Sequence, residues 1–294
     1  LQSLDSDGNR TNGIIIPPAA ASALTAIDLT VVPASLSTTT LQAAMTAGGI
    51  TTPIVSATDA QAHYIAQGMS SLSSNIWVSK TSAGVPETIV RFGANGEYVL
   101  GQITSDPNDP ITGVEYGTVT ITSFDANGYK LEATTSVDTN NTAGLSHLDA
   151  CDRLRSPGDE LIYTSGTSNE DGSCTGTETE KIAKADNDPT GIVGVWAEGS
   201  LTNLQESHFA FFTNGRFLHY GAPSLLGTPA GIESGTYSYN TTSKTLKIET
   251  VDVDTDPADG FAAGETLPFT VNTNGTATIN DPLDGVITLY RVSK

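Results

Sequence analysis

The stretch Phe92-Gly-Ala-Asn95-Gly96-Glu-Tyr98 returns 119 residues later as Phe211-Phe-Thr-Asn214-Gly215-Arg-Phe217. An Asn-Gly pair between aromatic residues is typical of a β-hairpin turn. Three further landmarks recur in the same order, at offsets that drift only from 119 to 116 residues. They are Trp77 and Trp196, Gly113-Val-Glu115-Tyr-Gly117-Thr118 and Gly231-Ile-Glu233-Ser-Gly235-Thr236, and Val137-Asp138-Thr139 and Val253-Asp254-Thr255. One structural unit is therefore present twice in the chain.

The length of the hairpin turn determines which residues face the core. A two-residue turn at Asn95-Gly96 would mix polar and apolar residues on one face. A three-residue turn, with Gly96 in the left-handed region, instead places Phe92 opposite Tyr98 and separates the two faces. Because strand register follows the hydrophobic pattern, we predict the three-residue turn in both copies.

The same register assigns two faces to the hairpin of the second copy. Its core face holds Phe209, Phe211, Phe217 and His219. Its other face holds Phe212, Leu218 and Tyr220, where the first copy presents Arg91 and Glu97 to water. An apolar face of this kind is either covered, by the N-terminal helices or by another chain, or exposed as a binding patch. We therefore predict that Phe212, Leu218 and Tyr220 form a ligand-binding or interface surface.

The chain of 294 residues carries 33 acidic and 13 basic residues, a formal net charge of -20. Such a surface repels nucleic acids and anionic membranes, and it attracts cations. The chain begins at Leu1, which predicts that an export signal has been removed. No run of about 18 apolar residues is present, so we expect no membrane-spanning helix. These features predict a secreted or cell-surface protein with no nucleic-acid partner.

The chain contains two cysteines, Cys151 and Cys174, and both lie in the first copy. In an exported protein such a pair predicts one disulfide. The segment between them is rich in Gly, Ser and Asp, so a cross-link would stabilise it. No histidine or second cysteine pair lies at the spacing of zinc ligands, which argues against a zinc site.

The repeat divides the chain into three regions. Residues 1–74 are predicted to be a mixed α/β region, with an extended segment at Ile14-Ile15-Ile16. Residues 75–190 and 191–294 hold the two copies, in which turn residues recur about every ten positions between short strands. This pattern predicts a mainly β protein built from barrels or sandwiches. The two N-terminal helices are expected near Leu41–Met45 and Asp59–Gln67.

The repeated unit resembles the bacterial lipocalin-like proteins. It opens with a tryptophan, as in Gly191-Ile-Val-Gly194-Val-Trp196, continues with the hairpin, and in the second copy closes with Ile287-Thr-Leu289-Tyr-Arg291-Val292. The first copy departs from this pattern, because Asn75-Ile-Trp77 lacks the glycine. The resemblance covers about residues 75–294 and implies two tandem antiparallel barrels in an exported, often cell-surface, non-enzymatic protein.

Alternating oxygen-bearing residues at the N-terminus predict a calcium site. Asp5, Asp7, Asn9 and Thr11 would supply the hard oxygen ligands that Ca²⁺ prefers. The match to an EF-hand loop is partial, because the glycine comes early and Ile16 stands where a bidentate Glu would be. The alternative is a solvated, turn-rich terminus. A second acidic cluster, either a weak cation site or a charged surface, comprises Asp252, Asp254, Asp256 and Asp259.

The sequence contains no catalytic motif of the Gly-x-Ser-x-Gly, Walker or His-Glu-x-x-His type. By the hairpin register, His208 and His219 lie on opposite faces of a strand pair, so they do not form a metal pair. The carboxylate pair of a glycosidase usually comes with several cleft aromatics. The two tryptophans instead occupy equivalent repeat positions. A secreted hydrolase is therefore the least favoured function.

Two non-catalytic functions remain. The first is a structural or adhesive surface or matrix protein that assembles with itself or with another surface component. Ile14-Ile15-Ile16 would then add as a strand to a neighbouring sheet edge. The second is a carrier or sensor that holds a small apolar ligand inside a barrel, although a filled core explains the aromatic face equally well. We expect the first function, with Ca²⁺ as the only cofactor.

Overall fold

The computed structural model describes residues 68–73, 75–104, 109–125, 128–140, 143–156, 159–169, 174–199, 204, 206–221, 230–256, 260–281 and 285–292. Residues Gln67–Lys294 form one compact unit. The predicted extended segment, the two predicted helices and the predicted calcium ligands all fall within residues 1–67, outside the described residues. In the part of the chain that is described, no helix is long and apolar enough to cross a membrane.

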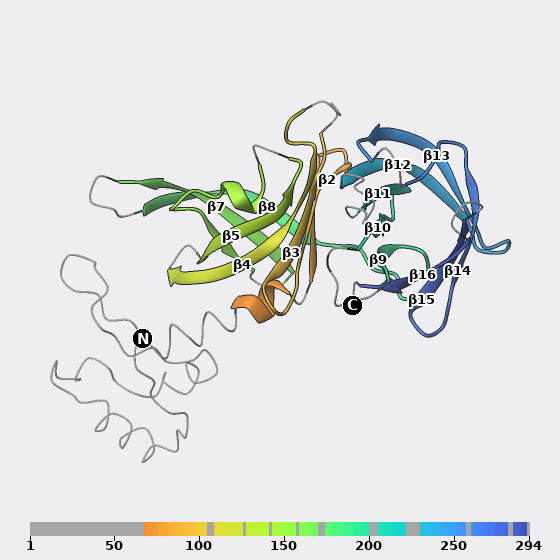
Figure 1. Cartoon of the computed structure of the whole chain (residues 1–294), viewed down its shortest axis with the longest axis horizontal. Helices are drawn as coiled ribbons and strands as arrows, with labels where there is room; N and C mark the ends of the chain where they lie inside the picture. Colours follow the sequence, from red (N-terminus) through yellow and green to blue (C-terminus); the bar gives the residue numbers. More distant parts are fainter. Residues whose placement is uncertain are drawn as a thin grey trace, which may run out of the picture. The chain divides into compact units, whose positions relative to one another are not determined.

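The first barrel is a closed antiparallel sheet in which each strand pairs with the next and β1 pairs with β8 (Figure 1). Its strands are β1 (Ile76–Lys80), β2 (Pro86–Phe92), β3 (Glu97–Gln102), β4 (Gly113–Asp125), β5 (Gly128–Asp138), β6 (Arg153–Arg155), β7 (Glu160–Ser168) and β8 (Cys174–Lys184). A short 3-10 helix, η3 (Leu145–His147), lies between β5 and β6. A helical turn at residues 68–72 precedes β1.

The second barrel repeats this topology, and β16 closes it by pairing with β9. Its strands are β9 (Gly194–Glu198), β10 (His208–Phe211), β11 (Arg216–Gly221), β12 (Gly231–Asn240), β13 (Thr245–Asp254), β14 (Thr266–Val271), β15 (Thr276–Asp281) and β16 (Gly285–Arg291). The prediction of a mainly β protein with two tandem antiparallel barrels is confirmed. Strands β1–β8 lie within residues 75–190 and β9–β16 within residues 191–294.

The repeated hairpin has the predicted register in both copies. Phe92 lies opposite Tyr98 in the first copy, and Phe211 lies opposite Phe217 in the second. Gly96 adopts a φ of 89°, the left-handed conformation that a three-residue turn requires and that glycine adopts without steric cost. The three-residue turn is therefore confirmed, and the predicted core face of the second copy points into its barrel.

Each barrel begins with a fully buried tryptophan whose indole N–H is satisfied in the same way. Trp77 in β1 donates to the carbonyl oxygen of Leu72 at 3.1 Å. Trp196 in β9 donates to the carbonyl oxygen of Ile192 at 2.8 Å. A buried indole needs such a partner. The repeated tryptophan therefore fixes the chain just before the first strand of each barrel.

The last strand of the second barrel is tied to the first through Arg291. Its guanidinium lies over the ring of Trp196, 4.0 Å from the ring centroid. It also donates to the carbonyl oxygens of Gly191 and Val193, in the segment that leads into β9. Stacking and hydrogen bonding together use both the face and the edge of the guanidinium, so Arg291 helps to close this end of the barrel.

The disulfide Cys151–Cys174 is present, with the two Cα atoms 5.4 Å apart, and the predicted pairing is confirmed. It joins the segment before β6 to the start of β8. Next to it, the buried carboxylate of Asp152 accepts hydrogen bonds from the hydroxyl of Tyr163 and from the backbone N–H of Gly166, at 2.7 and 2.9 Å. The cross-link and this carboxylate hold the β6–β8 side of the first barrel.

The outer faces of the two barrels pack against each other. One continuous cluster of buried apolar side chains combines β1–β4 with β9–β13. Phe212, Leu218 and Tyr220 belong to this cluster and are at most 1 % exposed. The first barrel therefore covers the apolar face of the second copy, rather than the N-terminal helices or another chain. Main members of the cluster are Ile76, Val78, Ile89, Val99, Val114, Tyr116, Val195, Ala210 and Ile232.

The expectation that Arg91 faces water is wrong. Arg91 is 9 % exposed, and its Nη1 donates to Nε2 of His208 in the second barrel at 2.7 Å. The other imidazole nitrogen, Nδ1, donates to the carbonyl oxygen of Glu206 at 2.7 Å. Because a guanidinium only donates and a carbonyl only accepts, these contacts specify a neutral His208. The alternation of residues within one copy could not reveal the contact between Arg91 and His208, because the two residues lie 117 positions apart in different copies.

We expect the native protein to lose stability as the pH falls from about 7 to about 5, through His208. Burial, assisted by the charge of Arg91, lowers the pKa of His208 from 6.5 to about 3. As the pH falls below 6.5, the unfolded chain therefore binds a proton that the native chain does not. The free energy of unfolding then falls by up to about 1.4 kcal/mol per pH unit, which urea unfolding at several pH values measures.

The control for this pH dependence is a histidine replacement. His208→Gln keeps an acceptor for Arg91 but does not titrate, so it should remove most of the slope between about pH 7 and about pH 5. If the free energy of unfolding of His208→Gln depended on pH as it does in the parent protein, His208 could not be the cause of the pH dependence.

Candidate ligand cavity

Each barrel buries one carboxylate on the strand that follows the hairpin. Glu115 in β4 is fully buried, and Glu233 in β12 is 2 % exposed. The two residues occupy the same place in the repeated Gly-x-Glu-x-Gly landmark. A buried carboxylate requires strong hydrogen bonds in place of water. The two barrels can therefore be compared by the hydrogen-bond partners of Glu115 and Glu233.

In the first barrel, one oxygen of Glu115 is bound by structural groups, and its Oε2 has no hydrogen-bond partner among the described residues. Its Oε1 accepts hydrogen bonds from the hydroxyl of Tyr98 and from the backbone N–H of Ser146, the latter at 2.8 Å. Burial raises the pKa of Glu115, and these hydrogen bonds act in the opposite direction. Because Ser146 lies in η3, the carboxylate attaches the segment between β5 and β6 to β4.

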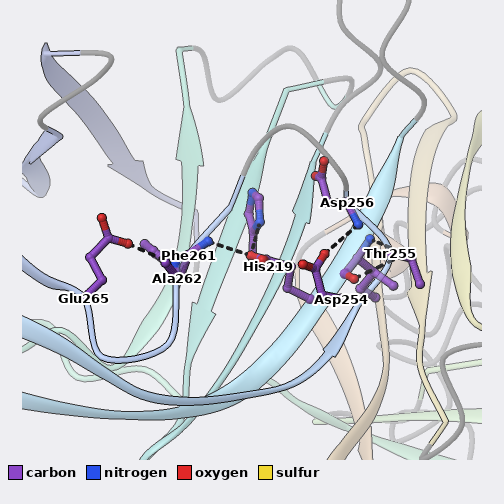
Figure 2. A network of polar contacts seen from close by, with 9 residues as sticks. His219, Asp254, Thr255, Asp256, Phe261, Ala262 and Glu265 are labelled. Atoms are coloured by element: carbon purple, nitrogen blue, oxygen red, sulfur yellow. Dashed lines mark hydrogen bonds and ion pairs between the residues drawn. The ribbon is translucent and has the colours of Figure 1, made fainter.

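In the second barrel, a histidine replaces the tyrosine as the partner. Oε2 of Glu233 accepts from Nδ1 of His219 at 3.1 Å and from the backbone N–H of Phe261 at 2.9 Å, so both groups meet at one carboxylate (Figure 2). The imidazole is 1 % exposed and stacks on Phe209, with ring centroids 4.4 Å apart. Its other nitrogen, Nε2, has no hydrogen-bond partner among the described residues.

The two copies differ at the positions that face the buried carboxylate. In the hairpin alignment, Phe217 replaces Tyr98 and His219 replaces Leu100. The first copy thus satisfies its carboxylate with a phenol and keeps an apolar side chain at the second position. The second copy satisfies it with one edge of an imidazole, which leaves the opposite edge for a further partner. A neutral His219 that donates from Nδ1 carries its lone pair on Nε2.

A glycine with positive φ covers each buried carboxylate. Gly144 has a φ of 97° and Gly260 a φ of 124°. A Cβ atom at either position would collide with Oε2 of Glu115 or Glu233. The two glycines lie 116 residues apart, the offset of the last sequence landmark. They belong to the repeated unit because a bare backbone allows the neighbouring N–H groups to reach the carboxylate.

A cavity of about 610 Å³ lies at one end of the second barrel. It is lined by the end of β9, the segment leading to β10, the end of β15 and the first half of β16, and His219 forms part of its wall. This volume lies within the range typical of small-molecule sites, about 300–1,000 Å³, although the accessible wall exposes more polar than apolar surface. The main apolar residues of this wall are Phe209, Phe261, Leu267, Ile279 and Ile287.

The polar part of the cavity wall is acidic. Glu198, Glu206 and Asp281 line the cavity, and each is half-buried. No Lys or Arg side chain is among the described residues of this wall. The carboxylate of Glu206 lies against the backbone of Gly199, which has a φ of 70° and no side chain to displace it. The cavity therefore combines aromatic and aliphatic surface with negative charge.

The first barrel contains a smaller cavity of about 290 Å³. Leu100 lines it at the position where His219 lines the larger cavity. Residues of η3 and its flanks cover one side, including His147. Its walls are mostly aliphatic, with Glu180 as the one acidic lining residue among those described. The first copy thus lacks the buried imidazole and the acidic wall that characterise the second.

The acidic cluster of the second copy does not converge on one point. Asp252 forms an ion pair with Arg216 at 3.0 Å. Asp254 accepts the backbone N–H of Asp256 at 2.9 Å (Figure 2), and Asp259 lies outside the described residues. Within the described ranges, no group of three or more His, Cys, Asp or Glu side chains could hold a metal ion. The calcium site at Asp5, Asp7, Asn9 and Thr11 remains a prediction.

Sequence reasoning placed His219 on the core face of the second barrel but missed its partner. The signal was available, since Glu233 and Glu115 are charged residues inside a repeated landmark whose other members are structural. Glu198, Glu206 and Asp281 carried no such signal, because they lie at unrelated positions near strand ends and only barrel closure brings them to one cavity.

Ser, Thr and Cys side chains of the described residues make no hydrogen bond to Nε2 of His219, so none is placed as a nucleophile.

The buried imidazole of His219 and the three acidic lining residues belong to the second barrel, whereas buried polar atoms without a described hydrogen-bond partner occur in both barrels. No protein-family model matches the chain, and a search of the curated proteins finds no match to it.

Proposed function

We propose that the protein is a carrier or sensor that binds a small, mainly apolar ligand inside its second barrel. The observation that carries this proposal is that His219, whose buried Nε2 has no described hydrogen-bond partner, lines a cavity of about 610 Å³. An unsatisfied buried polar atom costs about 1–3 kcal/mol. A ligand that supplies the missing hydrogen bond would remove this cost.

The shape of the wall supports a ligand rather than a packed core. The interior beyond the cavity is filled by Trp196, Phe211, Phe217 and Phe269, all at most 1 % exposed. A barrel of this size has room for side chains or for one small ligand. These aromatic side chains fill part of the interior, and the space beside His219 and Phe209 is not filled by side chains, as expected for a barrel that is stable without its ligand.

The proposal is tested with the neutral fluorescent probe N-phenyl-1-naphthylamine. We expect saturable binding to the full chain and a loss of affinity of about tenfold or more in Ile287→Trp, because a bulky ring at this half-buried position would occupy the cavity. Thr278→Trp is the matched control, since Thr278 lies on the adjacent strand and does not line the cavity. Absent binding, or equal affinity in Ile287→Trp and the parent, would refute the proposal.

We further propose that the chain is a lipocalin-like protein of the secreted or cell-surface class. Support comes from the two closed barrels, from the tryptophan and arginine that stack between the first and last strands of the second barrel, and from the disulfide. Disulfides persist mainly in oxidising compartments outside the cytosol. Detection of the native chain outside the cells that make it would test this assignment.

The structural or adhesive role remains a prediction. One of its supports is gone, because Phe212, Leu218 and Tyr220 are buried between the two barrels of the same chain. Its other support, strand addition by Ile14-Ile15-Ile16, lies outside the described residues. Light scattering of the full chain and of a chain lacking residues 1–18 would test it. Loss of assemblies on deletion would support the role, and assemblies that persist would contradict strand addition.

A further inference from the structure

We infer that the first barrel binds a divalent cation of the Ca²⁺ type between β4, β5 and η3, through side-chain oxygens of Glu115, Asp138 and Asn140. This site lies in the other barrel from the proposed ligand cavity and does not rest on the carrier function. It is also separate from the predicted calcium ligands between Asp5 and Thr11, which lie outside the described residues.

The first feature that leads to this site is a pair of carboxylates on neighbouring strands. Glu115 in β4 lies directly opposite Asp138 in β5, so the two side chains share one face of the sheet. Ser146 in η3 contacts both, because its backbone N–H donates to Oε1 of Glu115 at 2.8 Å and its hydroxyl donates to Oδ2 of Asp138 at 3.4 Å.

This pair of carboxylates has little positive charge beside it. Among the described residues, the contact of Asp138 with His147, at 3.5 Å, is the one ion pair that either carboxylate makes. Burial raises the pKa of Glu115, and the negative charge of Asp138 acts in the same direction. A cation bound between the two carboxylates would remove their repulsion.

The second feature is a set of buried polar atoms without hydrogen-bond partners. Oε2 of Glu115, Oδ1 of Asp138 and both amide atoms of Asn140 are buried, and none has a partner among the described residues. Asn140 is 0 % exposed. Buried polar groups require partners. A cation can bind all three side chains through oxygen and neutralise the carboxylates, whereas a water molecule has two donors and no charge.

The third feature is the convergence of these side chains at Gly144. A Cβ atom there would collide with Oε2 of Glu115 and would lie 3.1 Å from Nδ2 of Asn140, so both side chains reach the same point of the backbone. Because no hydrogen bond holds the amide of Asn140, rotation about its Cβ–Cγ bond would place Oδ1 there instead.

The chemistry of these ligands favours Ca²⁺. This ion binds carboxylate and amide oxygens and takes about 6–8 of them, so main-chain carbonyl oxygens and water would supply the rest. The ligands are two carboxylates and one amide. The set therefore differs from the groups of three or more His, Cys, Asp or Glu that are absent from the described ranges.

The second barrel provides a comparison within the same chain, because protein groups bind the equivalent atoms there. Oε2 of Glu233 contacts Nδ1 of His219 and the backbone N–H of Phe261 (Figure 2). Oδ1 of Asp254 accepts a backbone N–H at 2.9 Å. In the first barrel Leu100 stands at the position of the histidine and cannot bind a carboxylate. We therefore assign the cation to the first barrel alone.

Calcium titration of the full, chelator-treated chain near neutral pH tests this inference. Isothermal titration calorimetry should give a dissociation constant of about 10⁻⁴–10⁻³ M, the range of extracellular calcium modules. Asp138→Asn keeps the size of the side chain and removes its charge, so it should weaken binding by about tenfold or more. Asp254→Asn, at the equivalent position of the second copy, is the matched control and should leave the affinity unchanged.

Asn140→Ala separates a ligand from a structural amide. Because the amide makes no hydrogen bond among the described residues, the chelator-treated variant should unfold at nearly the same urea concentration as the parent. With saturating Ca²⁺, the parent should gain resistance to urea and the variant should gain much less. If the variant were stabilised by Ca²⁺ as much as the parent, Asn140 would not be a ligand and the inference would be overturned.

The remaining outcomes decide where calcium binds. The combined substitutions Asp5→Asn and Asp7→Asn alter the predicted N-terminal site, and we expect binding that persists in this variant and weakens in Asp138→Asn. Absence of saturable binding, or equal affinity in Asp138→Asn and the parent, overturns the inference. Loss of all binding in the N-terminal variant also overturns it, because the cation would then bind there. None of these results bears on N-phenyl-1-naphthylamine binding, which tests the carrier function separately.

Discussion

Trp196→Ala should lower the free energy of unfolding by about 3–5 kcal/mol, the usual cost of truncating a buried Trp to Ala. The side chain is fully buried, it packs edge-on against Phe269, and Arg291 covers its ring. The substitution opens a large cavity and leaves the carbonyl oxygen of Ile192 without its indole donor. Urea unfolding followed by circular dichroism measures the loss.

The second tryptophan makes this experiment more informative. The chain contains two tryptophans, so in Trp196→Ala the fluorescence of Trp77 reports on the first barrel alone. Because one apolar cluster joins the barrels, we expect the Trp77 transition to move to lower urea together with the circular dichroism transition. A Trp77 transition that stays in place would show that the barrels unfold independently.

A milder replacement serves as the control for the tryptophan. Trp196→Phe keeps an aromatic ring under Arg291 and removes only the indole N–H and part of the volume. We expect it to cost about 1–2 kcal/mol, roughly the sum of a lost hydrogen bond and a small cavity. Equal costs for Trp196→Phe and Trp196→Ala would contradict the importance of packing at this position.

Gly260→Ala should reduce stability by about 3 kcal/mol or more and also weaken ligand binding. An alanine there adopts an unfavourable positive φ and collides with the carboxylate of Glu233. The carboxylate has to move, and both of its hydrogen bonds, from His219 and from Phe261, are disturbed together. Urea unfolding and titration with N-phenyl-1-naphthylamine measure the two effects.

Gly264→Ala is the matched control, since it separates backbone strain from the collision. Gly264 also has a positive φ, of 84°, but a Cβ there meets nothing within 4 Å. We expect this variant to cost only about 1–2 kcal/mol and to leave ligand binding unchanged. Similar stability losses for Gly260→Ala and Gly264→Ala would contradict the proposed contact between Gly260 and Glu233.

Local patterns predicted the parts of this protein that depend on neighbouring residues. The Asn-Gly turn, with Phe92 opposite Tyr98, follows from short-range turn chemistry and from the alternation of apolar residues. The two equivalent tryptophans and the cysteine pair were equally visible in the sequence. The N-terminal predictions, including the calcium ligands and Ile14-Ile15-Ile16, were not tested by the described residues.

Predictions failed where two distant parts of the chain meet. Arg91 was expected in water because its own hairpin is polar on that side, yet the second barrel covers it and His208 binds it. The apolar face at Leu218 was predicted to be either covered or exposed as a binding patch, and the first barrel of the same chain covers it. A pattern within one repeat contains no information about how two repeats dock.

The sequence by itself determined that one β unit is made twice, where its hairpins turn, and which aromatic residues fill each interior. These features depend on alternation and turn residues, which act over a few positions. Only the tertiary structure decided that Glu233 binds His219, that His219 lines a cavity, and that Glu198, Glu206 and Asp281 share its wall. Barrel closure brings Glu198 and Asp281, which are 83 positions apart, to one cavity, and no local pattern encodes that proximity.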